Sequence, residues 1–240
     1  MLTDVQVRTA VGNGIKFLNG TREPYCLLFM NLMHRRFGIP EFADALQRYD
    51  DEVAARPKEA PVLRVLRRAG DANNPLRPED WDHVTIQTDQ ILATALYCDR
   101  LGLPPSFAEV LGRGVKQGGY HATHALLAWT WAEDNRCKLA APEGFAEEMF
   151  RAVAAILEDR PAILNDLKLE AAAFLCLARQ GKRVEAGFVR DVVAIQRPDG
   201  GWGKLGPPDP AKSEASSWHS TTLALLLLLH VKFPGARSSG

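Results

Sequence analysis

Apolar residues recur along most of the chain three and four positions apart, which is the spacing of one face of an α-helix. Alternating apolar and polar runs between hairpin turns, which indicate β-strands, are nearly absent. Glycine and proline separate many of the periodic segments, as at 38–40 and 102–104. The pattern therefore predicts an all-α protein. Its helices are expected near residues 3–19, 24–37, 41–55, 60–70, 84–101, 105–116, 120–134, 142–158, 163–180, 184–196 and 217–231.

Two kinds of predicted helix alternate along the chain. One kind is amphipathic, as in 145–159, and the other is apolar nearly all round, as in 91–97, 125–132, 171–178 and 222–229. A helix that is apolar all round is buried on every side, so these helices form an inner layer. Hairpins of one outer and one inner helix then repeat at a period of roughly 35–50 residues. Since the inner helices carry few charges, we favour a closed α/α toroid of about five hairpins over an open solenoid.

The predicted domain organisation follows from breaks in this period. Residues 1–232 form a single toroid domain, and 233–240 form a flexible C-terminal tail. The segment 56–83, which contains four prolines, interrupts the repeat and is expected to be an inserted loop with a short helix.

Composition narrows the range of partners. Lys plus Arg and Asp plus Glu each number 29, so the balance offers no basic excess for nucleic acid or an anionic membrane. The longest apolar run, 223–229, is too short to span a bilayer. The four cysteines form no Cys-x-x-Cys pair and mostly lie in apolar helical runs, so we expect structural, reduced thiols. These features, together with an N-terminus that lacks a signal pattern, predict a cytoplasmic protein without membrane insertion. We also expect no nucleotide cofactor.

Two short motifs resemble a known group of toroids. The segment 188–203 contains Gln196, then Gly200-Gly201-Trp202, and resembles the Gln-Trp repeat of squalene and oxidosqualene cyclases. The segment from Ser216 through Trp218-His219 resembles the inner helix that follows such repeats in those cyclases and in protein prenyltransferase β-subunits. The match spans about 188–230. It implies a toroid in which Gln196 bonds the backbone of a neighbouring hairpin and Trp202 wedges between hairpins.

The chain departs from these families where their chemistry lies. The Asp-x-Asp-Asp acid motif of squalene-hopene-type cyclases is absent, so cyclisation by that acid has no support. His219 matches the position of a zinc-binding histidine in the prenyltransferases, but their Asp-x-Cys pair is missing. A metal would therefore need other ligands.

Aligning the apolar runs of the inner helices suggests those ligands. Asp89, His124, Glu170 and His219 fall at one position of the common frame, roughly one hairpin apart. Two imidazoles and two carboxylates suit a divalent metal, zinc or else iron or manganese. His121, three residues before His124 on the same helical face, is the candidate catalytic base or else a fifth ligand.

Two other interpretations of this set stay open. The residues could be polar side chains lining the ring without a metal, or ordinary helix caps and core residues. The helix dipole favours acidic groups near a helix N-terminus, which accounts for Asp89 and in part for Glu170. It does not account for the two histidines, which it would hold in the neutral form that a metal requires.

Aromatic side chains on the same helices predict an apolar pocket, although aromatic residues at helical spacing are also typical of a core. The candidates are Tyr97, Tyr120, Trp129, Phe174 and Trp218.

The leading hypothesis is a metal-dependent enzyme of the lyase, cyclase or transferase type. It would act in the central funnel on a mainly apolar small molecule such as a terpenoid or another secondary metabolite. A non-catalytic toroid that binds a ligand or a partner is the alternative, with a homo-oligomer or a second subunit open. A polysaccharide lyase-like toroid is third.

Overall fold

The computed structural model describes residues 2–158, 165–203 and 215–236. Within these ranges the regular elements are helices, apart from one isolated bridge between Trp202 and Ser217, so the all-α prediction is confirmed. No helix in the described ranges has the length and apolar character needed to cross a membrane. The helices are α1 (Asp4–Leu18), α2 (Pro24–Phe37), η1 (Pro40–Phe42), α3 (Ala45–Ala55), α4 (Ala60–Leu66), η2 (Arg67–Ala69), α5 (Pro78–Trp81), α6 (Gln87–Leu96), α7 (Cys98–Leu101), α8 (Phe107–Gln117), α9 (Gly119–Asp134), α10 (Phe145–Glu158), α11 (Asp166–Leu177), η3 (Gly181–Arg183), α12 (Ala186–Ala194) and α13 (Trp218–Lys232).

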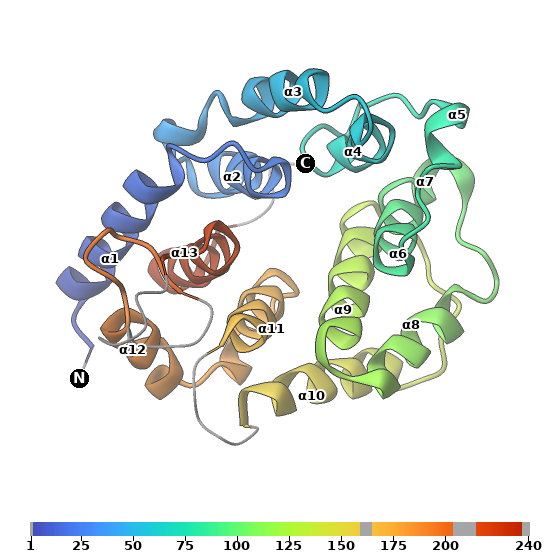
Figure 1. Cartoon of the computed structure of the whole chain (residues 1–240). Coiled ribbons are helices and arrows are strands. Elements are labelled where there is room, and N and C mark those ends of the chain that lie inside the picture. The colour runs from blue at the N-terminus through green and yellow to red at the C-terminus, as the bar shows by residue number, and fades with distance from the viewer. Residues whose placement is uncertain (1, 159–164, 204–214, 237–240) are drawn as a thin grey trace.

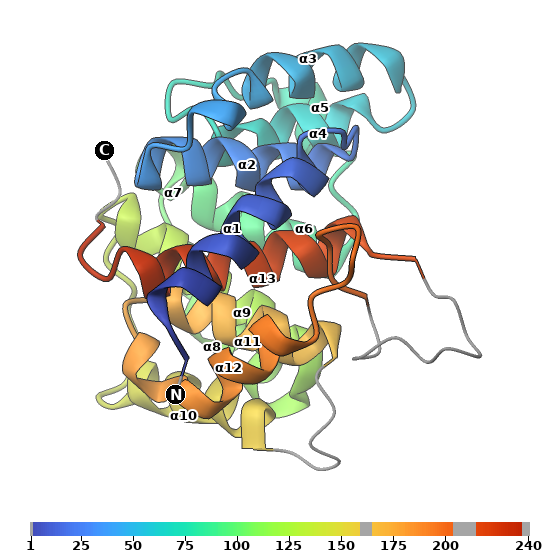
Figure 2. The same ribbon diagram turned by 90° about the vertical axis from the view of Figure 1, so that its left-hand side faces the viewer.

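Five helices, α2, α6, α9, α11 and α13, lie around the middle of the molecule, and we call them the inner helices (Figure 1). Along this series α6 packs on α9, α9 on α11, α11 on α13, and α13 on α2. Helices α1, α3, α8, α10 and α12 lie outside them (Figure 1). In the view turned by 90°, α1 crosses in front of α13, and the two helices are in contact (Figure 2).

Burial explains why the inner helices are apolar all round. Every residue of α11 from Lys168 to Leu177 is buried, and so is every residue of α13 from Ser220 to Leu229. The outer helix α10 buries only Met149 and Val153, which lie one turn apart on one face. The predicted alternation of inner and outer helices is therefore present in the structure.

The predicted helix 84–101 divides at Tyr97 into α6 and α7. The side-chain amide of Asn135 donates to the carbonyls of Ala95 and Leu96, and Arg68 donates to that of Leu96. The last carbonyls of a helix have no partner within the helix, and these tertiary hydrogen bonds supply donors for them, so α6 can end here. The local sequence does not predict this break.

The segment 56–83 is more helical than an inserted loop. It contains α4, η2 and α5, and Leu66 and Ala69 line the same cavity as the inner helices. Part of the segment thus belongs to the inner layer. In the predicted tail, Phe233 stacks on Phe37 with ring centroids 6.2 Å apart, whereas 237–240 lie outside the described residues.

The segment 196–202 joins the chain's last helical hairpin to its first helix. Gln196 Nε2 donates to the carbonyls of Ala10 in α1 (2.8 Å) and Gly200 (2.9 Å). Trp202 is fully buried, donates from Nε1 to Val192 O (2.7 Å), and lies against Gly14 of α1. Both predicted roles, a backbone bond from Gln196 and a wedge by Trp202, are confirmed.

Two of the four cysteines correct the prediction of reduced thiols. Cys98 and Cys137 form a disulfide across 39 residues, while Cys26 and Cys176 are free and buried. Spacing alone could not reveal the pair, because the fold brings the end of α9 beside α7. Since disulfides are typical of oxidising compartments, the cytoplasmic prediction loses the support that it drew from cysteine usage.

Candidate functional site

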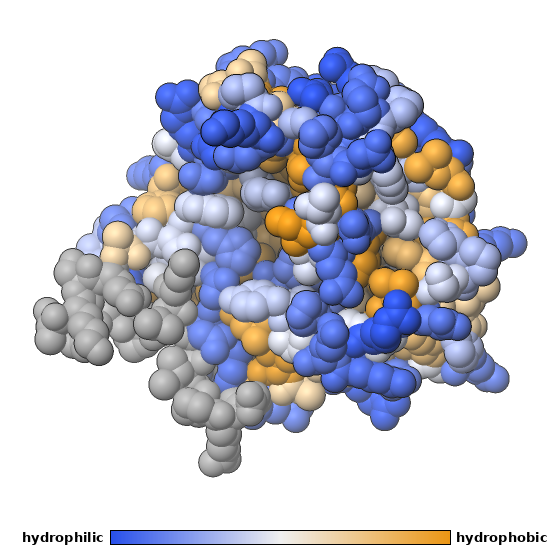
Figure 3. All heavy atoms as spheres, turned by 45° about the vertical axis from the view of Figure 1, so that its right-hand side comes forward, coloured by the Kyte–Doolittle hydropathy of each residue, from blue (hydrophilic) through white to orange (hydrophobic). Residues whose placement is uncertain are grey.

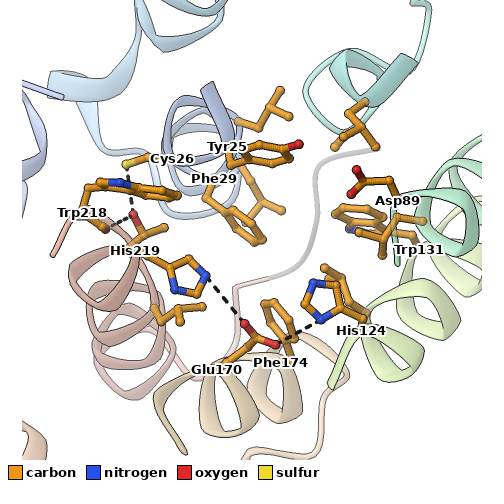
Figure 4. Close-up of a pocket in the computed structure, with 18 residues that line it drawn as sticks. Tyr25, Cys26, Phe29, Asp89, His124, Trp131, Glu170, Phe174, Trp218 and His219 are labelled. Carbon is orange, nitrogen blue, oxygen red and sulfur yellow. Dashed lines mark hydrogen bonds and ion pairs between the residues drawn. The ribbon is translucent and has the colours of Figure 1, made fainter. Parts of the chain in front are cut away.

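The inner helices surround a cavity of about 280 Å³, which we call the central cavity. All five contribute side chains to its wall, and the segment α4–η2 adds Leu66 and Ala69. Most of the wall is apolar and aromatic, as Figure 4 shows from inside. On the face seen in Figure 3 a hollow is bordered mostly by hydrophilic residues, with hydrophobic residues deeper in. This composition suits a mainly apolar ligand with a few polar contacts.

The four predicted metal ligands all line this cavity. Asp89 comes from α6, His124 from α9, Glu170 from α11 and His219 from α13. Figure 4 shows the two imidazoles on either side of Glu170, and Asp89 on the wall beyond His124. The structure thus brings the four aligned residues to one cavity, while their role as metal ligands stays a prediction.

Glu170 is the centre of this group. Its side chain is 2% exposed, and it lies 3.4 Å from His124 (Oε1 to Nδ1) and 3.7 Å from His219 (Oε2 to Nε2). The hydroxyl of Thr123 donates to Oε1. Burying a carboxylate costs free energy unless it has such partners, and these contacts supply them.

Asp166, the first residue of α11, completes the group. Its carboxylate accepts hydrogen bonds from His219 Nδ1 (2.7 Å), Ser220 Oγ (2.6 Å) and the hydroxyl of Tyr120 (3.1 Å). The cap itself is Asn165, which accepts from the amide of Lys168. We call Asp166, His219, Glu170 and His124 the carboxylate–imidazole cluster.

The pKa shifts of three groups show how the cluster and Asp89 act on one another. Burial favours a lower pKa for His124, but the hydrogen bond and charge of Glu170, the carbonyl of Tyr120 and the charge of Asp89 outweigh it, so the pKa is raised. Burial also favours a higher pKa for Asp166, yet its hydrogen bonds, first that from His219, lower the pKa. Burial raises the pKa of Asp89, and His124 opposes that shift. The raised pKa of His124 opposes the expected effect of the helix dipole, and the main cause of the increase is the buried carboxylate of Glu170.

The donors suit a divalent metal in type but not in position. Nδ1 of His219 is bonded to Asp166, and Nδ1 of His124 is bonded to Tyr120 O (2.8 Å). This leaves Nε2 of His124 for a ligand, whereas Nε2 of His219 faces Glu170 Oε2 at 3.7 Å; a ring held through Nδ1 is a common arrangement around metals. Within the described residues, however, no three His, Cys, Asp or Glu side chains form a group that could hold a metal ion as they stand.

The other predicted site residues divide between the cavity and elsewhere. Phe174 and Trp218 line the cavity, whereas Trp129 lies against Phe145 of the outer helix α10, with ring centroids 5.9 Å apart. Tyr97 is fully buried, and its hydroxyl bonds Asn74 and Val65. Tyr120 is 45% exposed.

His121, the predicted catalytic base, is exposed and lies outside the cavity wall.

Sequence reasoning missed several residues of the cavity wall. Trp131 lines the cavity from α9, and Tyr25 and Phe29 line it from α2. Cys26 lies beside Thr222, with 3.0 Å between Sγ and Oγ1. The helical period of α2 could have indicated Tyr25 and Phe29, which lie four residues apart.

Comparison with known proteins adds no assignment to this geometry, because no protein-family model, no curated protein and no solved structure matches the chain.

Proposed function

We propose that this chain is an enzyme that takes a mainly apolar small molecule into the central cavity and transfers protons at the molecule's polar end. The observation that carries the proposal is the carboxylate–imidazole cluster in the wall of an otherwise apolar cavity. Perturbed titratable groups in a cleft are typical of active sites. The substrate class, a terpenoid or another secondary metabolite, is part of the proposal.

We also propose that the helices form a closed α/α toroid, as the resemblance of 188–230 to cyclases and prenyltransferases implies. The contact of α1 with α13 and the hydrogen bond from Gln196 to Ala10 support closure, since both join the two ends of the helical series. A closed wall would exclude water from the cavity, which strengthens electrostatic interactions inside it.

In the proposed chemistry, His124 is the general acid. Its raised pKa keeps a proton available, Glu170 stabilises the imidazolium, and Nε2 is free to face the substrate. Asp89, whose burial raises its pKa, is the general base on the neighbouring wall. Asp166 orients His219 through Nδ1. A proton given at one point and taken at another suits a lyase or cyclase reaction.

A test of this chemistry uses a panel of terpenoid alcohols, ketones and alkenes in deuterium oxide, followed by mass spectrometry. At least one compound should gain deuterium or change its structure. Glu170→Gln and His124→Gln should slow the reaction by about 100-fold or more, the usual contribution of a general acid or base. Glu133→Gln, which removes an exposed carboxylate from the same helix as His124, is the matched control and should react at the wild-type rate.

The outcomes separate the hypotheses. Compounds that raise the melting temperature without exchange or turnover would overturn the enzyme and favour the non-catalytic ligand-binding module. If no compound binds, the cavity is not a ligand site. The polysaccharide lyase-like alternative requires an open polar groove, and the mainly apolar wall of the central cavity argues against it.

Metal binding by Asp89, His124, Glu170 and His219 is a separate proposal, and no step above depends on it. The free Nε2 of His124 supports it, as does Nε2 of His219, which already faces a carboxylate oxygen of Glu170 at 3.7 Å; rotation of Glu170 and Asp89 would be needed to complete the site. The test is elemental analysis after incubation with zinc, iron(II) or manganese. One equivalent of metal should bind, and His124→Ala and His219→Ala should lose it. A metal-free wild type would overturn the proposal, and metal retained in both variants would overturn the ligand assignment.

A further inference from the structure

A second cavity, of about 340 Å³, lies next to the central one. Leu32, Ala69 and Trp131 belong to the walls of both, so the two cavities adjoin at these residues. The second cavity is lined by the C-terminal ends of α2, α6, α9 and α11 and by η2. We call it the arginine cavity after the four arginines in its wall, Arg35, Arg36, Arg68 and Arg136.

Part of this positive charge has a structural role. Arg68 donates from Nε to Leu96 O and from Nη2 to both carboxylate oxygens of Asp99, at 2.8 and 2.6 Å. Arg35 donates to the carbonyl of Ala69. Cations near helix C-termini are stabilised by the helix dipole, and these bonds fit that role.

Two other guanidinium nitrogens in the wall are buried without a hydrogen-bond partner among the described residues. Arg68 is only 5% exposed, yet its Nη1 has no hydrogen-bond partner among the described residues. Nε of Arg36 is likewise buried and without a partner there, and no ion pair of Arg36 occurs in the described ranges. A buried donor without a partner destabilises the fold, and more so when the group is charged. Such groups are normally satisfied by a ligand, an ion or water.

The carboxylates nearby do not cancel this charge. Asp99 forms an ion pair with Arg68. Asp134, which also lines the cavity, forms one with Arg179 at 3.4 Å. Burial lowers the pKa of Arg36, and the charge of Asp134 opposes that shift only in part. A negatively charged oxygen beside Arg36 would supply the missing partner.

We propose that the arginine cavity binds the oxyanion group, phosphate or carboxylate, of a ligand whose apolar body occupies the central cavity. Planar guanidinium groups with several free donors suit such oxygens, because two parallel hydrogen bonds can form at once. The inference rests on the proposed function, since it names the chemical class of the molecule that the central cavity takes.

The test compares decyl phosphate, decanoate, decanol and inorganic phosphate by isothermal titration calorimetry. Arg36→Gln is the informative variant, because Arg36 makes no hydrogen bond or ion pair in the described ranges that its loss would break. Arg151→Gln, which removes one exposed positive charge from the outer helix α10, is the matched control.

We expect the better of the two anionic ligands to bind at least about tenfold more tightly than decanol, the value of one charge-assisted hydrogen bond. Arg36→Gln should abolish most of that difference and leave decanol binding unchanged, while Arg151→Gln should match the wild type. Preference for decyl phosphate or for decanoate identifies the oxyanion.

Two results would overturn the inference. One is equal affinity for decanol and both anions, and the other is an unchanged preference in Arg36→Gln. Either result with decanol bound leaves the proposed function standing. If inorganic phosphate binds through Arg36 but no decyl compound binds, the oxyanion site is real and the central-cavity proposal is the one that fails. If nothing binds, both fail.

Discussion

The hydrogen bonds of Gln196 predict how strongly the two ends of the helical series are joined. Replacing Gln196 with alanine removes donors to Ala10 O at 2.8 Å and to Gly200 O at 2.9 Å. Each such bond contributes about 0.5–1.5 kcal/mol net, so Gln196→Ala should lower the free energy of unfolding by about 1–3 kcal/mol. Gln47→Ala is the control, because the exposed Gln47 bonds only Asp51 on its own helix and should stay within about 0.5 kcal/mol.

The assay has two parts, urea unfolding followed by circular dichroism and amide hydrogen exchange resolved by segment. Because Gln196 bonds α1, exchange should quicken in α1 and remain at the wild-type rate in α3. Gln196→Glu should destabilise at least as much, since it places a carboxylate oxygen against two carbonyls. A Gln196→Ala protein with wild-type stability would refute the reasoning. Faster exchange everywhere, with no preference for α1, would refute the part that concerns closure.

Three further predictions concern other parts of the chain. Gly200 has φ +89°, and a Cβ there would lie 2.6 Å from Asn13 O. Gly200→Ala should therefore lower the free energy of unfolding by about 1–3 kcal/mol. Gly12 lies on α1 with open space around it, so Gly12→Ala should raise that free energy by about 0.5–1 kcal/mol. Reducing the disulfide between Cys98 and Cys137, which spans 39 residues, should lower the free energy of unfolding in urea by about 4 kcal/mol. Finding four titratable thiols in the non-reduced, denatured chain would contradict the pairing. The raised pKa of His124 predicts an NMR titration midpoint above about 6.5, which should fall in Glu170→Gln, and a wild-type midpoint below 6.5 would contradict this. The contribution of the His124–Glu170 pair to the free energy of unfolding is complete below about pH 6.5 and disappears as the pH rises through the pKa of the folded state.

The fold was largely predictable because apolar periodicity reports burial directly. Inner helices such as α11 and α13 are buried on all sides, so they could only be apolar all round. The end of α6 was not predictable, since it depends on Arg68 and Asn135, which approach from other elements. The same is true of the disulfide, whose partners meet only through the packing of the folded chain.

The site was predictable where a polar residue interrupted an apolar helix. Glu170 and His219 stood out for that reason, and the common frame of the inner helices brought them together. The aromatic residues gave no such signal. Helix α9 is apolar nearly all round, so its sequence has no polar face to mark the outside. Trp129 and Trp131 differ by two residues, about 200° around the helix axis, and only the fold decides that Trp131 faces the cavity.

The direction of the inner helices accounts for the separation of charge along the two cavities. The carboxylates of Asp89 and Asp166 lie in the first turns of α6 and α11, and Glu170 follows one turn later, whereas Arg36 lies in the last turn of α2. Helix dipoles favour this distribution. They do not explain why Glu170 is enclosed by two imidazoles, or why buried donors of Arg36 and Arg68 lack partners among the described residues. The charges that dipoles leave unexplained are those facing the cavities. They therefore predict one orientation for a ligand that spans both, with its oxyanion at the arginines and its reacting group between His124 and Asp89.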